Sequence, residues 1–172
     1  MVMDRKGVSP VIATVLLLVL TIVIGGIIFS VVIPFVKDSL GDSRACLNVF
    51  EGVEFSESKF NCYNSTALNT GFSVKLKKED IVGFRVALIG STGSSDVVDI
   101  KEGATLINVR MVGSGPSGYN AILAFPSVGG QRSYVAQGRY EKAEISPITK
   151  SGEICAVADK IDFTSCYRDV VL

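Results

Sequence analysis

Four cysteines are the side chains of this chain with the widest covalent chemistry. None of them forms a C-x-x-C pair, and the 172-residue sequence contains no histidine, so the residue sets of common zinc sites are missing. All four follow a long uncharged N-terminal segment. An even number of cysteines in that position is typical of disulfides in an oxidising exterior, with buried free thiols as the alternative. The four are Cys46, Cys62, Cys155 and Cys166.

The spacing of these cysteines favours local pairing. Cys46 and Cys62 have 15 residues between them and bracket an expected hairpin, and Cys155 and Cys166 have 10 residues between them. Bonds Cys46–Cys62 and Cys155–Cys166 would close two short loops, each worth about 3 kcal/mol at most in the chain-entropy model. The two crossed pairings stay open.

Other patterns that resemble catalytic or metal sites are incomplete. The glycine-rich stretch Gly113–Gly118 has no Gly-Lys-Ser/Thr ending and no following helix, so it predicts a turn rather than a phosphate loop. The carboxylate pairs Glu79/Asp80 and Asp96/Asp99 do not follow a calcium-loop spacing and are expected to be solvated surface charge. Because no imidazole can activate a serine or cysteine, we expect no enzyme activity, no catalytic residue, no metal and no cofactor.

Charge excludes one further class of function. Lys plus Arg and Asp plus Glu both number 17, and no basic face concentrates the cations. Nucleic-acid binding needs such a face to replace phosphate counterions, so no nucleic-acid partner is expected.

One sequence pattern indicates modification. Asn64-Ser65-Thr66 is the only N-x-[ST] sequon, and it lies in the polar stretch 61–70, an expected surface loop. Asn64 is therefore a candidate glycosylation site, and an unmodified turn is the alternative.

The N-terminal segment has the composition of a membrane span. No charged side chain occurs from Val8 to Val36, a run of 29 residues. As a helix this run reaches roughly 40 Å, more than a hydrocarbon core of about 30 Å requires. Ser9-Pro10 is a suitable helix start and Gly41 a suitable stop.

The flanking charges predict the orientation of this span. Arg5 and Lys6 precede it, so the short N-terminus should stay in the cytoplasm and the residues after Lys37 should lie outside. The apolar core is too long for a secretory signal, and no small-x-small cleavage site follows it.

The residues Lys6-Gly7-Val8-Ser9-Pro10-Val11-Ile12 resemble the N-terminus of archaeal type IV pilins and their archaellin-like relatives. In that family a prepilin peptidase of the membrane cuts after a small residue that follows a basic one. The resemblance therefore implies a cut between Gly7 and Val8, with Arg5 and Lys6 in the leader. Bacterial pilins carry a glutamate at the fifth mature position, where this chain has Ile12, which favours the archaeal branch.

The resemblance also implies what the apolar segment does after processing. A helix that is apolar on all faces must be surrounded by lipid or by other such helices. We expect self-assembly through this helix into a filament, with the membrane as its surroundings before assembly. The small-xxx-small pairs Thr21/Gly25 and Gly26/Ser30 would allow close helix approach. A plain single-span anchor is the alternative.

The remaining residues predict a β-rich domain. Short apolar stretches alternate with turns rich in Gly, Ser and Asn, the pattern of an antiparallel sandwich or barrel. The fold class expected is α+β: leader 1–7, apolar helix 8–41, and an extracellular immunoglobulin-like sandwich 42–172. Expected strands are Cys46–Val53, Phe72–Lys77, Val82–Ile89, Val97–Ile100, Thr105–Val112, Ala121–Phe125, Glu144–Ile148 and Ile154–Val157.

Three hypotheses for the function remain. The first is a structural subunit of an archaeal pilus-like extracellular filament that serves surface adhesion. The second is a membrane-anchored accessory protein of the archaellum, such as a stator or envelope-binding protein. The third is an anchored binding protein of unrelated role. Processing after Gly7 and recovery in sheared filaments would separate the first from the others.

Overall fold

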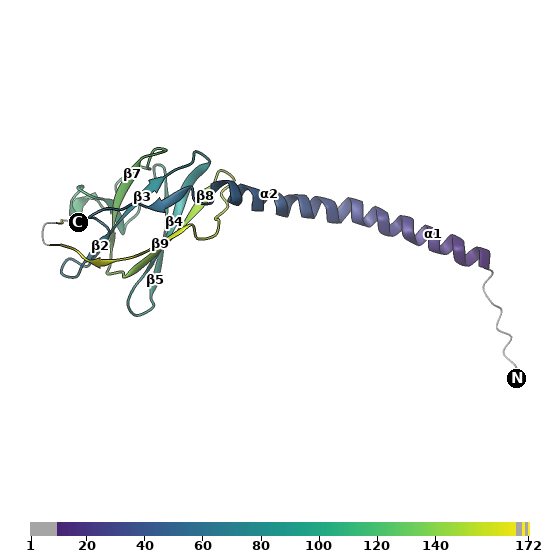
Figure 1. Cartoon of the computed structure of the whole chain (residues 1–172), viewed down its shortest axis with the longest axis horizontal. Coiled ribbons are helices and arrows are strands. Elements are labelled where there is room, and N and C mark those ends of the chain that lie inside the picture. The colour runs from purple at the N-terminus through teal and green to yellow at the C-terminus, as the bar shows by residue number, and fades with distance from the viewer. Residues whose placement is uncertain (1–9, 168–169, 171) are drawn as a thin grey trace, which may run out of the picture. The chain divides into compact units, whose positions relative to one another are not determined.

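The uncharged N-terminal run forms a helix. The computed structural model describes residues 10–167, 170 and 172, with the side chains of 37–44 and 116 left out of the description. The chain is helical through α1 (Pro10–Ile27), the π-helical segment η1 (Ile28–Val32) and α2 (Ile33–Val49). Figure 1 labels α1 and α2. Contacts divide the chain into two units, Met1–Ser43 and Arg44–Leu172, and the second is called the head below.

The expected helix stop at Gly41 is wrong, because α2 continues to Val49. A glycine inside a helix costs only about 1 kcal/mol relative to alanine, so it does not end a helix by itself. Val49 is 1% exposed and belongs to the core of the head, and burial of this last turn offsets that cost. The strand expected over Cys46–Val53 is therefore mostly helix.

The helix ends where the backbone reverses. Glu51 has φ 61°, in the left-handed region. A Cβ at Gly52 would lie 2.5 Å from the Ile81 side chain and 2.7 Å from the carbonyl oxygen of Val49, so no larger residue fits there. The turn leads directly into the first strand.

Two sheets form the head. The first has the order β10-β2-β3-β7-β6, and β1 also pairs with β3. β1 and β2 occupy successive halves of the same edge of β3: Val53 lies opposite Leu76, and Cys62 lies opposite Gly71. The strands are β1 (Val53–Phe55), β2 (Cys62–Asn64), β3 (Asn69–Leu76), β6 (Val109–Met111), β7 (Gln131–Gln137) and β10 (Thr164–Ser165).

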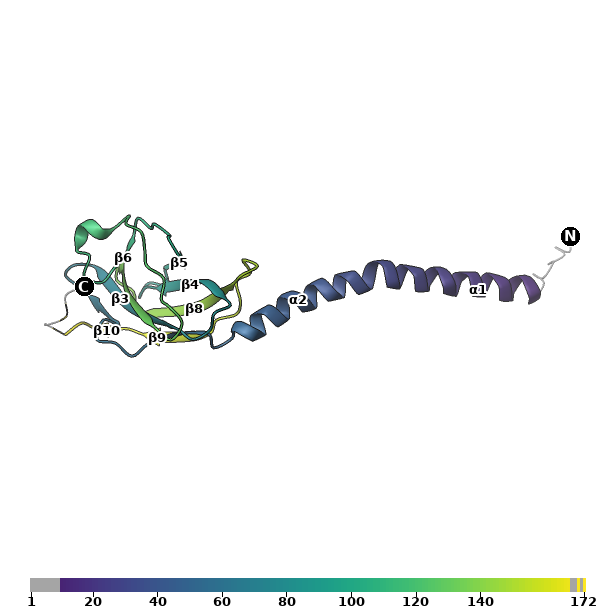
Figure 2. The same cartoon turned by 90° about the horizontal axis from the view of Figure 1, so that it is seen from above.

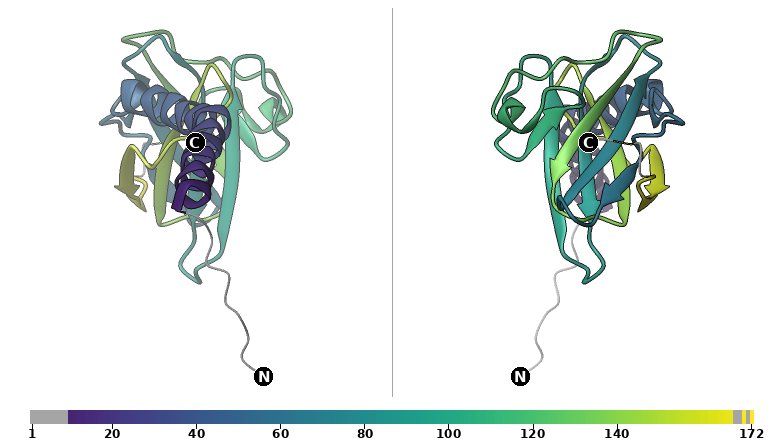
Figure 3. Two further views of the ribbon diagram at one scale, coloured as in Figure 1. Left: turned by 90° about the vertical axis from the view of Figure 1, so that its right-hand side faces the viewer. Right: turned by 90° about the vertical axis from the view of Figure 1, so that its left-hand side faces the viewer.

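The second sheet has the order β5-β4-β8-β9 and is antiparallel throughout. Its strands are β4 (Ile81–Ile89), β5 (Ser95–Lys101), β8 (Lys142–Thr149) and β9 (Asp159–Asp162). In the first sheet β10 pairs with β2 in parallel, a departure from the all-antiparallel expectation. Figure 2 shows β9 and β10 following one another along the side of the head, and Figure 3 shows the strands of the head from two opposite directions.

The core lies between the sheets, which makes the head a sandwich. Phe72 and Tyr134 come from the first sheet and Phe84 and Ile145 from the second, and all four are fully buried. The rings of Phe84 and Tyr134 meet edge to face across the two sheets, with centroids 6.0 Å apart. The predicted α+β architecture, a long apolar helix followed by a β-rich domain, is confirmed.

The expected strands agree with the structure unevenly. Those at 72–77, 82–89, 97–100 and 144–148 correspond to β3, β4, β5 and β8, and the one at 105–112 only to the short β6. The stretches Ala121–Phe125 and Ile154–Val157 contribute single bridges, Ile122 to Thr105 and Ile154 to Ile148, rather than strands. β2, β7, β9 and β10 were not expected, and β1 shares only Val53 with an expected strand.

Candidate assembly segment and flanking sites

The apolar helix buries none of its described residues. By length and composition Pro10–Val36 is able to cross a membrane, and none of its residues is buried within the chain. Mid-helix side chains such as Leu17 and Phe29 are exposed by 67% and 73%. A helix that presents aliphatic side chains on every face is stable only inside lipid or among similar helices.

The few polar side chains of this helix are already satisfied. The hydroxyls of Thr14 and Thr21 donate to the carbonyls of Val11 and Leu18, at 2.9 and 2.8 Å. Ser30 donates to the carbonyl of Gly26 at 2.8 Å. Since an unpaired polar group in a medium without water costs several kcal/mol, these internal bonds suit an apolar environment.

The π-helical segment ends two residues before Pro34. The Ile33 N–H bonds to the Ile28 carbonyl, five residues back, instead of four. Proline has no N–H and its ring clashes with the carbonyl four residues earlier, here that of Ser30. A widened turn is a common way to accommodate such a break, so the irregularity has a local cause in the sequence.

The last turn of α2 is tied to the strands of the head by three kinds of interaction. Val49 is buried, and Cys46 is disulfide-bonded to Cys155 with Cα atoms 5.3 Å apart. The Lys78 ammonium donates to the carbonyls of Asn48 and Phe50 at 2.8 and 2.9 Å. A cation on the free carbonyls at a helix C-terminus is favourable for the helix dipole. Lys78 was missed because lysine on a loop after a strand has no distinguishing sequence signal.

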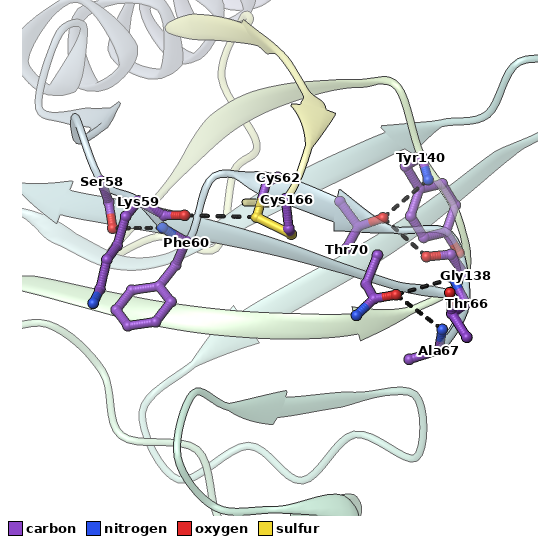
Figure 4. Close-up of a disulfide and its surroundings, with 11 residues drawn as sticks. Ser58, Lys59, Phe60, Cys62, Thr66, Ala67, Thr70, Gly138, Tyr140 and Cys166 are labelled. Carbon is purple, nitrogen blue, oxygen red and sulfur yellow. Dashed lines mark hydrogen bonds between the residues drawn. A yellow bond between two sulfur atoms is a disulfide. The ribbon is translucent and has the colours of Figure 1, made fainter. Parts of the chain in front are cut away.

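All four cysteines are disulfide-bonded, but the local pairing expected from their spacing is wrong. The bonds are Cys46–Cys155 and Cys62–Cys166, with sequence separations of 109 and 104. Figure 4 shows the second bond, where β10 runs beside β2. The four cysteines therefore join the beginning of the head to its last strands.

The topology explains the error. Cys46 precedes β1, which pairs with the Leu76 end of β3, whereas Cys62 lies opposite Gly71. Five residues along a strand correspond to about 17 Å, far beyond the reach of a disulfide. The Cys166 N–H bonds to the Tyr63 carbonyl at 3.0 Å, which brings Cys166 beside Cys62.

No protein-family model matches this chain, and no curated protein matches it.

The residues of the expected cleavage site lie outside the described residues. They are Arg5, Lys6, Gly7 and Val8.

The sequon lies at the end of β2 and in the turn that follows. Asn64 is half-buried, and Ser65–Leu68 are exposed. The Asn64 Oδ1 atom accepts from the backbone N–H groups of Thr66 and Ala67, at 2.9 and 3.0 Å. Among the described residues its Nδ2, the atom that would carry a glycan, has no hydrogen bond to another group. The two hydrogen bonds to Oδ1 therefore fix the orientation of the side-chain amide.

The carboxylate pair Asp96/Asp99 is divided between the two faces of β5. Asp96 accepts a hydrogen bond from the hydroxyl of the buried Tyr140. Asp99 lies on the other face and accepts two bonds from Arg85, at 2.6 and 2.7 Å. These bonds, opposed by partial burial, lower the pKa of Asp99. Within the described residues no group of three potential metal ligands comes together.

Proposed function

We propose that this protein is a structural subunit of an archaeal type IV pilus-like extracellular filament. The observation that carries the proposal is the helix Pro10–Val36, apolar on every face and without buried residues. Its polar side chains bond internally, so it can move from lipid into a helix bundle without exposing an unpaired group. Two disulfides in the head fit an oxidising exterior.

The proposed path begins in the membrane. The N-terminus is cytoplasmic, a prepilin peptidase cuts between Gly7 and Val8, and the mature helix joins the filament core with the head outside. The support for this step is the sequence Arg5-Lys6-Gly7-Val8 before the apolar run. The filament serves surface adhesion.

Electron microscopy of material sheared from cells, together with mass spectrometry of its subunits, tests the proposal. We expect filaments composed of this chain with Val8 as the N-terminal residue. Cleaved, stable protein that remains wholly in the membrane would favour the accessory protein of the archaellum. Surface protein that still begins at Met1 would refute the processing step.

Substitution at the cleavage site provides a matched pair. Gly7→Leu should block cutting, because the peptidase accepts a small residue at this position, and Gly7→Ala should leave it intact. Cutting of both variants at an equal rate would contradict the proposed site.

Asn64 is proposed as a glycosylation site of the extracellular head. Thr66→Ala removes the sequon without touching Asn64, and Thr66→Ser preserves it. Intact-mass measurement should show a loss far larger than the substitution itself for the first variant and for Asn64→Gln, but none for Thr66→Ser. If every variant differs in mass from the wild type only by the substitution itself, Asn64 is unmodified.

A further inference from the structure

Among the charged side chains that the structure describes, only Arg110 is almost fully buried, with 2% of its surface exposed. Arg110 lies in the middle of β6, opposite Val135 of β7. Its neighbours Val109 and Met111 pack with the core, so Arg110 lies on the outer face of the first sheet. It is covered there by the loop that contains η2 (Pro116–Gly118), visible beside β6 in Figure 2.

This guanidinium is not neutralised by any carboxylate of the described residues. Its carbon lies 5.1 Å from the centre of the Tyr119 ring, and Nη1 donates to the Met111 carbonyl at 3.3 Å. Nε is buried and has no acceptor among the described residues. A buried charge without a counterion is costly, and a buried donor without an acceptor adds to that cost. The arrangement therefore favours an anion that comes from outside the chain.

A groove of about 500 Å³ lies beside Met111 and Val112, the residues that follow Arg110, and Arg110 itself does not line it. It is lined by Met111 and Val112, by Ser133 of β7, and by Phe60 and Ser114 from two loops. The Ser114 hydroxyl donates to the Met111 carbonyl at 2.7 Å, the same oxygen that accepts from Arg110. The buried guanidinium and the groove thus meet at one carbonyl.

The groove has the chemistry of a site for a charged sugar. None of the described residues that line it is a carboxylate, and Arg132 supplies a cation to its wall. Phe60 supplies an aromatic wall, and Ser114, Ser133 and Gln131 supply hydroxyl and amide groups that can bond to sugar hydroxyls. Its volume is within the range of small-ligand sites.

We propose that this groove binds a carboxylated sugar of the uronic acid type. The sugar ring lies against Phe60, and its carboxylate enters at Ser114. There it replaces the Met111 carbonyl as the acceptor for Nη1 of Arg110, in a charge-assisted hydrogen bond. The proposal names the kind of surface to which the head attaches, and it does not require assembly into filaments.

Isothermal titration of the full-length protein in detergent micelles with trigalacturonate tests this site without filaments. We expect saturable binding, at least tenfold tighter than binding of a neutral trisaccharide or of inorganic phosphate. Phe60→Ala should weaken the binding at least tenfold without disturbing the buried charge. Arg110→Lys, which changes the buried cation, should also weaken the binding at least tenfold. Lys101→Ala, on the second sheet, should leave it unchanged.

Several results would overturn the proposal. One is the absence of saturable binding in wild-type protein, and another is equal affinity for the neutral trisaccharide or for phosphate. Unchanged affinity in Phe60→Ala would mean that any binding occurs outside the groove. The last result that would overturn the proposal concerns Asp169, which lies outside the described residues. If only the Asp169→Asn variant binds trigalacturonate, the carboxylate of Asp169 neutralises Arg110 in the wild-type chain.

Discussion

The apolar helix and the head differ in whether the chain itself buries their apolar side chains. In α1 no residue is buried, whereas the head buries a continuous core and closes two long disulfide loops. The head has its own core, and its folding therefore depends mainly on contacts within the chain. The helix lacks partners, so its environment must supply them. The two regions should respond differently to substitution.

The largest expected effect is from a charge in the middle of the helix. Val19→Asp should abolish filament formation, because an unpaired carboxylate is unfavourable both at the bilayer centre, by about 2.5–3.5 kcal/mol on insertion scales, and in a helix bundle. The head should still fold and form both disulfides. Electron microscopy of sheared material measures the effect, with Val19→Leu as the matched control. Filaments of Val19→Asp protein in normal number would show that the helix is not their core.

The next effect belongs to the disulfides. Replacement of Cys46 and Cys155 together by serine should lower the free energy of unfolding of the head by about 3–4 kcal/mol, the chain-entropy value for the loop of about 27 residues that this bond closes while the Cys62–Cys166 bond is intact. Urea denaturation measures the change, with Ser165→Ala as the control. Non-reducing peptide mapping of the wild type should recover Cys46–Cys155 and Cys62–Cys166 peptides. A map with Cys46–Cys62 peptides would contradict this connectivity.

A smaller effect concerns the end of α2. Lys78→Met keeps the apolar stem but removes the cation from the carbonyls of Asn48 and Phe50, and should cost about 1 kcal/mol. Hydrogen exchange should become faster in the last turn of α2. Lys101→Met, on an edge strand of the second sheet, should change neither property. Equal effects of the two substitutions would deny Lys78 a capping role.

The smallest effect should be a gain in stability. Glu51→Gly relieves a left-handed backbone conformation that costs a residue with a Cβ about 1–2 kcal/mol, but it also increases the entropy of the unfolded chain. A net increase of about 0.5–1 kcal/mol is expected from thermal unfolding. Glu57→Gly, in an exposed loop without such a conformation, should be neutral or destabilising. A loss of stability in Glu51→Gly would mean that the carboxylate of Glu51 matters more than its backbone.

The sequence predicts those elements whose signal is local. The uncharged run from Val8 to Val36 predicts the helix, and alternation predicts β3 and β4 closely. β7 lacks alternation because Tyr134, Val135 and Ala136 are buried on both faces of the sheet, while its first residues are polar. The helix end was misplaced because burial of Val49 in the head is a tertiary contact.

The candidate sites follow the same division. The cleavage motif and the sequon are short continuous patterns that can be recognised directly. The disulfide connectivity depends on which end of β3 each cysteine approaches, and spacing does not encode that. Arg110 resembles an outward-facing residue of an edge strand, and only the fold of the loop with Tyr119 over it makes it a buried cation.

The disulfide arrangement has a mechanical consequence. When tension is applied between Cys46 and Cys166, the shortest covalent path crosses the Cys46–Cys155 bond and continues along the segment 155–166. The alternative path runs along 46–62 and crosses the Cys62–Cys166 bond. Residues 63–154 form a third and much longer connection between the same two ends, and they stay unloaded because a shorter path becomes taut first. At about 3.3–3.6 Å per residue the distance between Cys46 and Cys166 can reach roughly 40 Å before the shortest path is taut, against about 400 Å without the bonds. Most of the sandwich, including β3, β4 and β7, is thereby shielded from a pull along the chain.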